Sequence, residues 1–311
     1  MNARFPARRE WLLAAAIAVV CGLLIWGLVW QHGRVLATPE AQLARVPTRD
    51  AVVLYVDFDG LRRAGLLQML AGSRVSAEPE YRDFVEKTHF DYTTDLDTAL
   101  VSFAPSGKYC MLRGHFDWAK LRAYAVQAKG ECRRDLCRME GSTPERNISF
   151  VRLQRGLMAL AISRDGEAAG GMRQRDADAR PIEIPAAPLW VSLPGSALNA
   201  GPELPAGTRI FARTLANAQS VTLALAPEGG RFALRMDVRC RTAAEAAALA
   251  QVLEKATAVL REMLAREGKT PNPRDLSGVL AAGTFRPSEA QVSGHWPVER
   301  GFFEELLRNP S

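Results

Sequence analysis

The chain has 311 residues, of which 48% are hydrophobic and 24% are charged. These fractions are ordinary for a globular protein and exclude an intrinsically disordered chain. The 40 lysines and arginines exceed the 34 aspartates and glutamates by a formal net charge of +6. Because both signs are dispersed along the chain, the sequence predicts no nucleic-acid-binding patch.

Residues 11–30 form an apolar run that contains neither a charged residue nor a proline. A helix rises about 1.5 Å per residue, so a run of this length matches the roughly 30 Å hydrocarbon core of a bilayer. Trp11 opens the run, and Trp26 and Trp30 close it, which places indole rings at both membrane interfaces. The pattern predicts a single transmembrane helix over residues 11–31.

The charges that precede this run predict its orientation. Arg4, Arg8 and Arg9 are opposed only by Glu10, so residues 1–10 are expected in the cytoplasm by the positive-inside rule. The chain is then a single-pass protein of the inner (cytoplasmic) membrane, with its body in the periplasm or outside the cell. A cleaved signal peptide is the alternative, although its apolar region is ordinarily only about 7–15 residues long. Both interpretations place the body outside the cytoplasm.

The first part of the body follows a polar segment that predicts a stalk. This stalk covers residues 32–50 and contains Pro39 and Pro47. We predict a first α+β half over residues 51–175 from alternating strand-like and helix-like patterns. Its predicted elements are a strand at 51–56, helices at 61–70, 78–88 and 117–128, a hairpin around the turn 104–108, and strands at 147–153 and 157–163.

A proline-rich segment, residues 176–188, predicts a linker to a second half over residues 189–311. The segment 223–234 resembles 101–112, since each contains two apolar stretches around an Ala-Pro-x-Gly turn. An amphipathic helix is expected from Ala243 to about Glu267, started by a capping box of Thr242 and Glu245. Its apolar residues at helical spacing are Leu249, Val252, Leu253, Val259, Leu260, Met263 and Leu264.

The remaining elements complete a repeated order. A short helix at 276–282, a hairpin around 286–288 and a terminal helix at 298–307 follow the long helix. The order β-α-β-β-α-β-β is thus expected once in each half. It predicts the α+β fold class: an antiparallel sheet with packed helices, in two related halves.

Cys132 and Cys137 flank a short polar loop. An exported compartment is oxidising, so we expect a local structural disulfide between them. Free thiols are the alternative, whereas a zinc or redox pair needs further ligands or a Cys-x-x-Cys spacing, and neither is present. Cys110 and Cys240 lie on separate predicted strands, and their pairing stays open.

The segment 52–60, Val-Val-Leu-Tyr-Val-Asp-Phe-Asp-Gly, resembles the opening motif of haloacid-dehalogenase-type phosphatases. The resemblance implies a magnesium-dependent enzyme with Asp57 as nucleophile and Asp59 as acid/base. Leu61 departs from the family pattern, and no later acidic cluster is present to hold magnesium. The alternative is structural: Asp57 ends a strand and Asp59 caps the next helix.

Other motifs predict no chemistry. Asp95 and Asp97 form a second Asp-x-Asp, expected in a solvated turn. Gly268-Lys-Thr270 lacks the leading glycine of a phosphate loop, and the four histidines are scattered, with His295 beside Trp296. No serine lies in a nucleophile elbow. The sequence therefore predicts no catalytic residue, no metal site and no cofactor.

The start of the body, Pro47–Asp57, reads Pro-x-x-Asp-Ala-Val-Val-Leu-Tyr-Val-Asp. Together with the single anchor and the two halves, it resembles uncharacterised bacterial envelope proteins. The resemblance implies an extracytoplasmic body and no known activity. It supplies no functional residue.

The first functional hypothesis is therefore a non-catalytic module that binds another envelope protein or envelope component at the membrane surface. The phosphatase is one alternative. A carrier of an apolar ligand is another, and it predicts an apolar cavity lined by strand residues such as Leu54 and Val56.

Overall fold

The computed structural model describes residues 36, 38–67, 79–141, 143, 146–198 and 214–308. The predicted cytoplasmic segment 1–10, the transmembrane helix 11–31 and part of the first predicted helix, residues 68–70, lie outside these ranges. None of the helices within them combines the length and apolarity that crossing a bilayer requires.

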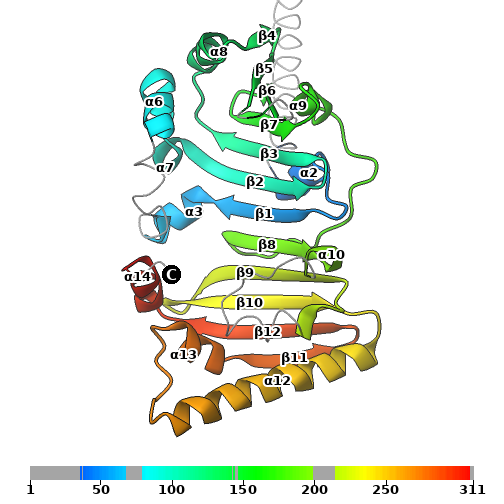
Figure 1. Cartoon of the computed structure of the whole chain (residues 1–311), viewed down its shortest axis with the longest axis vertical. Helices are drawn as coiled ribbons and strands as arrows, with labels where there is room; N and C mark the ends of the chain where they lie inside the picture. Colours follow the sequence, from blue (N-terminus) through cyan, green and yellow to red (C-terminus); the bar gives the residue numbers. More distant parts are fainter. Residues whose placement is uncertain are drawn as a thin grey trace, which may run out of the picture.

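The strands of the described chain form one 12-stranded sheet in the order β11-β12-β10-β9-β8-β1-β2-β3-β7-β6-β5-β4 (Figure 1). Every neighbouring pair is antiparallel. The predicted α+β class with an antiparallel sheet is confirmed. The strands are β1 Val52–Asp57, β2 Leu96–Ala104, β3 Gly107–Gly114, β4 Glu131–Arg133, β5 Leu136–Glu140, β6 Asn147–Gln154, β7 Leu157–Ser163, β8 Leu189–Pro194, β9 Ser220–Glu228, β10 Arg231–Arg239, β11 Thr284–Ser288 and β12 Gln291–Val298.

The helices begin where side chains satisfy free backbone N–H groups. The hydroxyl of Thr242 accepts a hydrogen bond from the backbone N–H of Glu245 (3.1 Å), and the Glu245 carboxylate accepts one from that of Arg241 (3.0 Å). The helices are α2 Pro39–Leu43, α3 Phe58–Arg63, α6 Pro79–Thr88, α7 Tyr92–Asp95, α8 Trp118–Gln127, α9 Ala168–Gly171, α10 Gly195–Leu198, α12 Ala243–Arg266, α13 Leu276–Ala281 and α14 Arg300–Arg308.

The connectivity in the first half recurs in the second. β1, β2 and β3 form a meander, and after α8 the strand β7 of the last hairpin pairs with β3. β8, β9 and β10 form the corresponding meander, and after α12 the strand β12 pairs with β10. The hairpin of β4 and β5 interrupts this correspondence in the first half. The two halves meet where β1 pairs with β8.

The predicted match between the two hairpin turns is wrong in detail. Pro105 lies in the two-residue turn between Ala104 and Gly107. Pro227 instead lies within β9, opposite Phe232, and the second turn consists of Gly229 and Gly230. Both glycines have positive φ, +55° and +79°, because a tight hairpin turn of this kind requires left-handed backbone at both central positions.

The predicted stalk is also wrong for residues 38–50, which belong to the folded body. Leu43 and Val46 are buried against the sheet. The hydroxyl of Thr48 donates to the carbonyl of Arg180 (3.0 Å), and that of Ser102 donates to the carbonyl of Pro47. The polar composition misled the prediction, because these polar groups are buried with partners rather than solvated.

Residues 176–188, the predicted linker, run along the same face as α2. Ile182 and Ile184 pack against a buried cluster that also contains Val53, Leu100 and Trp190. We call this the α2 cluster. The segment therefore covers a sheet that both halves share.

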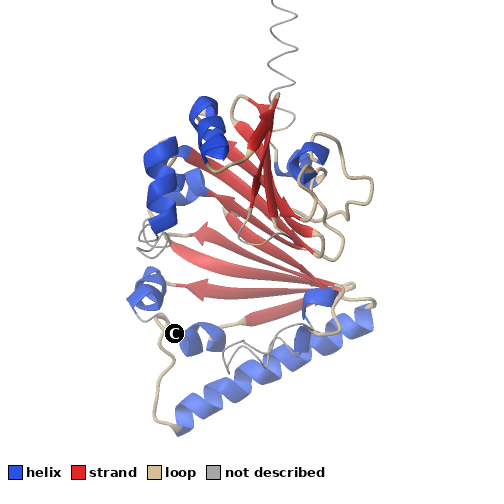
Figure 2. Cartoon of the chain, turned by 45° about the horizontal axis from the view of Figure 1, so that its top comes forward, coloured by secondary structure: helices blue, strands red, loops and turns tan. Residues whose placement is uncertain are grey.

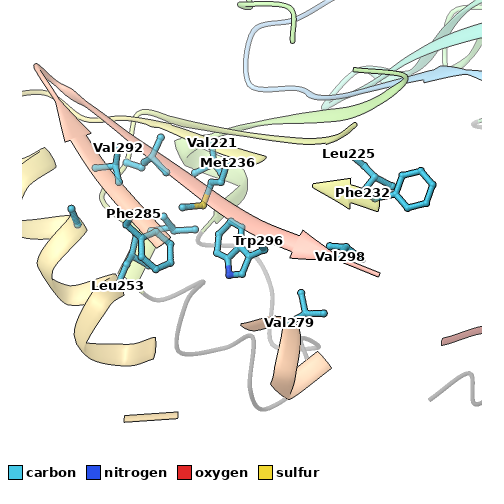
Figure 3. Close-up of a cluster of buried hydrophobic side chains, with 14 of the residues drawn as sticks. Val221, Leu225, Phe232, Met236, Leu253, Val279, Phe285, Val292, Trp296 and Val298 are labelled. Atoms are coloured by element: carbon cyan, nitrogen blue, oxygen red, sulfur yellow. The ribbon is translucent and has the colours of Figure 1, made fainter. Parts of the chain in front are cut away.

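Two further clusters lie on the opposite face of the sheet. The α12 cluster contains Leu225, Phe232, Met236, Leu253 and Trp296, and Figure 3 shows Leu253 on α12 near Met236 and Trp296, with Leu225 and Phe232 further from this helix. The α8 cluster contains Leu121, Ala125, Phe150 and Met158. These two clusters lie on the same face of the sheet. Val56 packs on the α12 cluster and Leu112 packs on the α8 cluster, and each of them pairs directly with Ala99 on β2. Residues that pair directly point to the same side of a sheet.

The long helix buries fewer of its apolar residues than its pattern predicts. Leu253 and Leu264 are buried, but Val252, Val259 and Met263 remain 46%, 54% and 53% exposed. The cause is geometric: α12 lies across β11 and β12 at one end of the sheet, so only one narrow stripe of its surface contacts the strands.

Trp190 on β8 lies directly opposite Tyr55 on β1, and their rings stack at 5.5 Å. Trp190 is 1% exposed. We expect Trp190→Ala in the full chain to lower the free energy of unfolding by about 3–5 kcal/mol, because truncation leaves a cavity between the two halves. Urea unfolding followed by far-UV circular dichroism measures the loss.

Val126→Ala is the matched control, because Val126 is 59% exposed on α8. Its effect is expected to stay within about 0.5 kcal/mol. Equal losses for the two variants would show that the contact between β1 and β8 is not a centre of stability.

Candidate functional site

The carboxylates of the phosphatase-like motif serve the start of α3. Asp57 is its N-cap and accepts a hydrogen bond from the backbone N–H of Gly60 at 2.8 Å. Asp59 forms ion pairs with Arg62 (3.3 Å) and Arg63. Within the described residues no three His, Cys, Asp or Glu side chains come together as metal ligands. The cap belongs to Asp57 and not to Asp59, but both roles are structural.

The carboxylates of the second Asp-x-Asp also have partners within the fold. Asp95 accepts a hydrogen bond from the backbone N–H of Asp91 (2.8 Å), and Asp97 lies 3.6 Å from Arg113. His295 contacts Glu228 at 2.8 Å on the exposed strand face. Trp296 beside it is 4% exposed and belongs to the α12 cluster, so it is a core residue.

An open cleft of about 1380 Å³ lies between β3, the start of α8 and the turn after β6. Two of its arginines have carboxylate partners: Arg152 contacts Asp135 (3.5 Å) and Arg113 contacts Asp97 (3.6 Å). Arg152 also lies 5.7 Å from the centre of the Trp118 ring. Trp118 donates its indole N–H to the carbonyl of Arg155 (3.4 Å). The cleft therefore presents a surface of mixed charge, and its lining residues include no nucleophile paired to a base.

Cys132 and Cys137 are joined in a disulfide across the β4–β5 hairpin, with 4.0 Å between their Cα atoms. This confirms the expected pairing. Cys110 and Cys240 are both free, since Cys110 lies on β3 and Cys240 follows β10 on the other side of the sheet centre. Cys110 and Cys240 therefore do not pair with each other.

The strongest candidate site is apolar and lies on the central strands, on the face that carries α8 and α12. One row of side chains runs across the sheet through direct pairs of Val191 with Leu54, Leu54 with Val101, and Val101 with Cys110. A second row lies nearer the β2–β3 turn. It contains, in register order, Val52, Phe103, Lys108, Ile162 and Ile148. We call the eight residues other than Lys108 the central apolar face.

This face is only partly covered by the described chain. Phe103 is 41% exposed and the other seven residues are partly exposed. None of the eight belongs to the three buried clusters. Figures 1 and 2 show why, because α8 and α12 lie towards opposite ends of the sheet and leave the middle strands between them.

The two ends of the first row show how the face is bounded. Leu223, which pairs with Val191, packs on the α12 cluster. Leu160, which pairs with Cys110, packs on the α8 cluster. The central apolar face therefore lies between two helix-covered ends of one sheet. Within the described residues it is partly exposed, so it differs from the enclosed cavity expected of an apolar carrier, and Val56 belongs to the core at its side.

Cations gather where the second row meets the strand ends. A cleft of about 710 Å³ there is lined by Phe103, Ile148 and Ile162 and by Lys108, Arg146 and Arg164. The Lys108 ammonium lies 5.9 Å from the centre of the Phe103 ring. In the described parts of the chain, no carboxylate forms an ion pair with Lys108 or Arg146. The site thus combines an apolar floor with a positively charged rim.

Cys110 reports on the polarity of this floor. Desolvation by its apolar neighbours raises the pKa of the Cys110 thiol to about 11, although nearby Lys108 acts in the opposite direction. The thiol is therefore protonated and weakly nucleophilic at neutral pH. Its position in the first row makes it a natural probe of the site.

Sequence reasoning named Leu54 but missed the site. The available signal was β1 itself, where Val52 to Val56 are five consecutive apolar residues, a pattern typical of a strand covered on both faces. Only the structure shows that, among the described residues, Val52 and Leu54 on one of those faces remain partly exposed.

No family model and no curated protein matches the chain. Among solved structures, crystal forms I and III of TP0453 are similar at 9% and 8% identity, with TM-scores of 0.47 and 0.48. Each match covers 86% of this chain and 98% of the other. Likeness at this level assigns neither a family nor a function.

The alkylation of Cys110 tests the site's polarity. We expect its rate with iodoacetamide to keep rising with pH up to about 11, because only the thiolate reacts and the raised pKa keeps the thiolate scarce below that pH. Peptide mass spectrometry of the full chain quantifies modification at this residue. A model cysteine peptide, with a pKa of about 8.5, is the control. A plateau for Cys110 near the pH of the control would contradict an apolar floor.

Proposed function

We propose that the protein is a non-catalytic, membrane-anchored binding module whose central apolar face contacts its partner outside the cytoplasm. The observation that carries this function is the group of apolar side chains that the described chain leaves partly exposed between two helix-covered ends of the sheet. Contiguous apolar surface in contact with water is unfavourable, and large patches of this kind mark binding sites.

The proposed location has independent support. The apolar run 11–30 and the arginines before it favour a single span with the body outside the cytoplasm. A disulfide between Cys132 and Cys137 is typical of an oxidising compartment. The body is then an envelope module in the periplasm or outside the cell, tethered to the inner membrane, and its partner is an envelope protein or component.

We also propose that the two halves are related by duplication. Their strand connectivities correspond, and the facing residues at the junction occupy corresponding positions. Tyr55 pairs with Leu100 on the second strand of the first meander, and Trp190 pairs with Ala224 on the second strand of the other. On this proposal the contact of Tyr55 with Trp190 lies on a pseudo-twofold axis.

A reporter fused after Ser311 tests the location. We expect alkaline phosphatase, which requires an oxidising compartment, to be active in this fusion, and a cytoplasm-dependent fluorescent reporter to be dark. Deleting residues 11–31 is expected to reverse both results. A fusion active only in the cytoplasm would refute the topology.

Photo-cross-linking tests the surface itself. With a benzophenone amino acid at Phe103 in the full chain, we expect a defined adduct in intact cells, because this side chain is exposed on the central apolar face. Val101→Lys is expected to abolish the adduct by placing a charge in the contact. Adduct mass is measured after purification.

Two controls make the result specific. The benzophenone at Val126, which is exposed on α8 away from the face, is expected to give no corresponding adduct, and Val126→Lys is expected to leave the adduct at position 103 unchanged. Identical adducts from both positions would count against a dedicated binding face.

A further inference from the structure

Resting on the proposed function, we infer that the occupant of the central apolar face is an anionic membrane phospholipid, with its acyl chains on the strand rows and its headgroup at the cationic rim. The rim consists of Lys108, Arg146 and Arg164, which line one cleft with Phe103, Ile148 and Ile162. Two of these three cations, Lys108 and Arg146, form no ion pair with a carboxylate of the described residues.

The chemistry of the floor favours acyl chains over a polypeptide. The strands satisfy their own backbone hydrogen bonds within the sheet, so the two rows present side chains without hydrogen-bonding groups apart from Lys108 and the Cys110 thiol. A peptide strand laid on it would bury N–H and C=O groups without partners. Acyl chains have no such groups.

The dimensions of the face also fit. Neighbouring strands are about 4.8 Å apart, so the second row, from β1 across β2, β3 and β7 to β6, spans about 19 Å. One leaflet contributes half of a roughly 30 Å hydrocarbon core, about 15 Å, to the length of an acyl chain. The cleft volume of about 710 Å³ lies within the range of roughly 300–1,000 Å³ typical of small-molecule sites.

The charge distribution selects the headgroup. Lys108 stands in the middle of the second row, Arg146 directly precedes β6 and Arg164 directly follows β7, and all three cations line the same cleft. Guanidinium groups bind phosphate through two parallel hydrogen bonds, and an ammonium adds a compact charge. A zwitterionic headgroup, whose own cation opposes this field, is bound less tightly.

The test uses the full chain in nonionic detergent micelles and measures protection of Cys110 from iodoacetamide at pH 9. Phosphatidylglycerol is compared with phosphatidylcholine of identical acyl chains, and each rate is divided by that of the same protein without lipid. We expect phosphatidylglycerol to protect Cys110 at concentrations about tenfold or more below those of phosphatidylcholine, a ratio equivalent to about 1.4 kcal/mol.

Variants separate the rim from the anchor. Lys108→Gln combined with Arg146→Gln is expected to remove the tenfold preference, while circular dichroism confirms an unchanged fold. Arg8→Gln combined with Arg9→Gln removes cations beside the predicted transmembrane helix instead, and is expected to keep the preference.

The outcomes distinguish the lipid occupant from the binding face itself. Equal protection by both lipids would overturn the choice of an anionic headgroup and leave a binding face. No protection by either lipid, with a protein adduct at position 103, would overturn the lipid and identify a protein occupant. No protection and no adduct would overturn the binding face as well.

Discussion

The pairing of β1 with β8 is the interaction on which the rest of the structure depends. Four residue pairs, from Val53 with Ser192 to Val56 with Leu189, join the two meanders into one continuous sheet. Without this pairing each half would present an unpaired inner edge and could not share the α2 cluster, to which Val53 and Trp190 both contribute. The stack of Tyr55 on Trp190 adds aromatic contact at the same place.

Joining the halves in this way explains the open face. Each crossover helix packs mainly on the outer strands of its own half, α8 on β4 and β5 and α12 on β11 and β12. The opposite face is closed in the middle by α2 and by residues 176–188, which carry Ile182 and Ile184 onto the strands. On the face that carries α8 and α12, Leu54 and Val101 stay partly exposed in the described part of the chain. Because each crossover helix covers the outer strands of its own half, apolar side chains stay partly exposed where the halves meet.

Local features were predictable from the sequence, and long-range ones were not. The capping of α12 by Thr242 and the apolar strand Val52–Val56 each depend on residues that are close in the sequence, so sequence patterns predict both elements. The burial of Val46 depends on a sheet partner far away in the chain, so residues 38–50 looked like a stalk. Likewise, Val252 has helical spacing but no strand opposite it, and periodicity alone does not show which apolar stripe receives a partner.

The edges of the sheet indicate that binding uses its face. An unpaired edge strand recruits other strands unless the edge is short, charged or interrupted by proline. β4 has only 3 residues and is tied to β5 by the disulfide of Cys132 with Cys137. At the other edge, β11 carries Arg286 and Pro287, and Pro287 lacks the N–H that strand addition requires. Both edges therefore resist extension of the sheet by a partner strand. The surface left for a partner is the central apolar face, where Phe103 is exposed, the aliphatic side chains are partly exposed, and Lys108 and Arg146 have no carboxylate partner among the described residues.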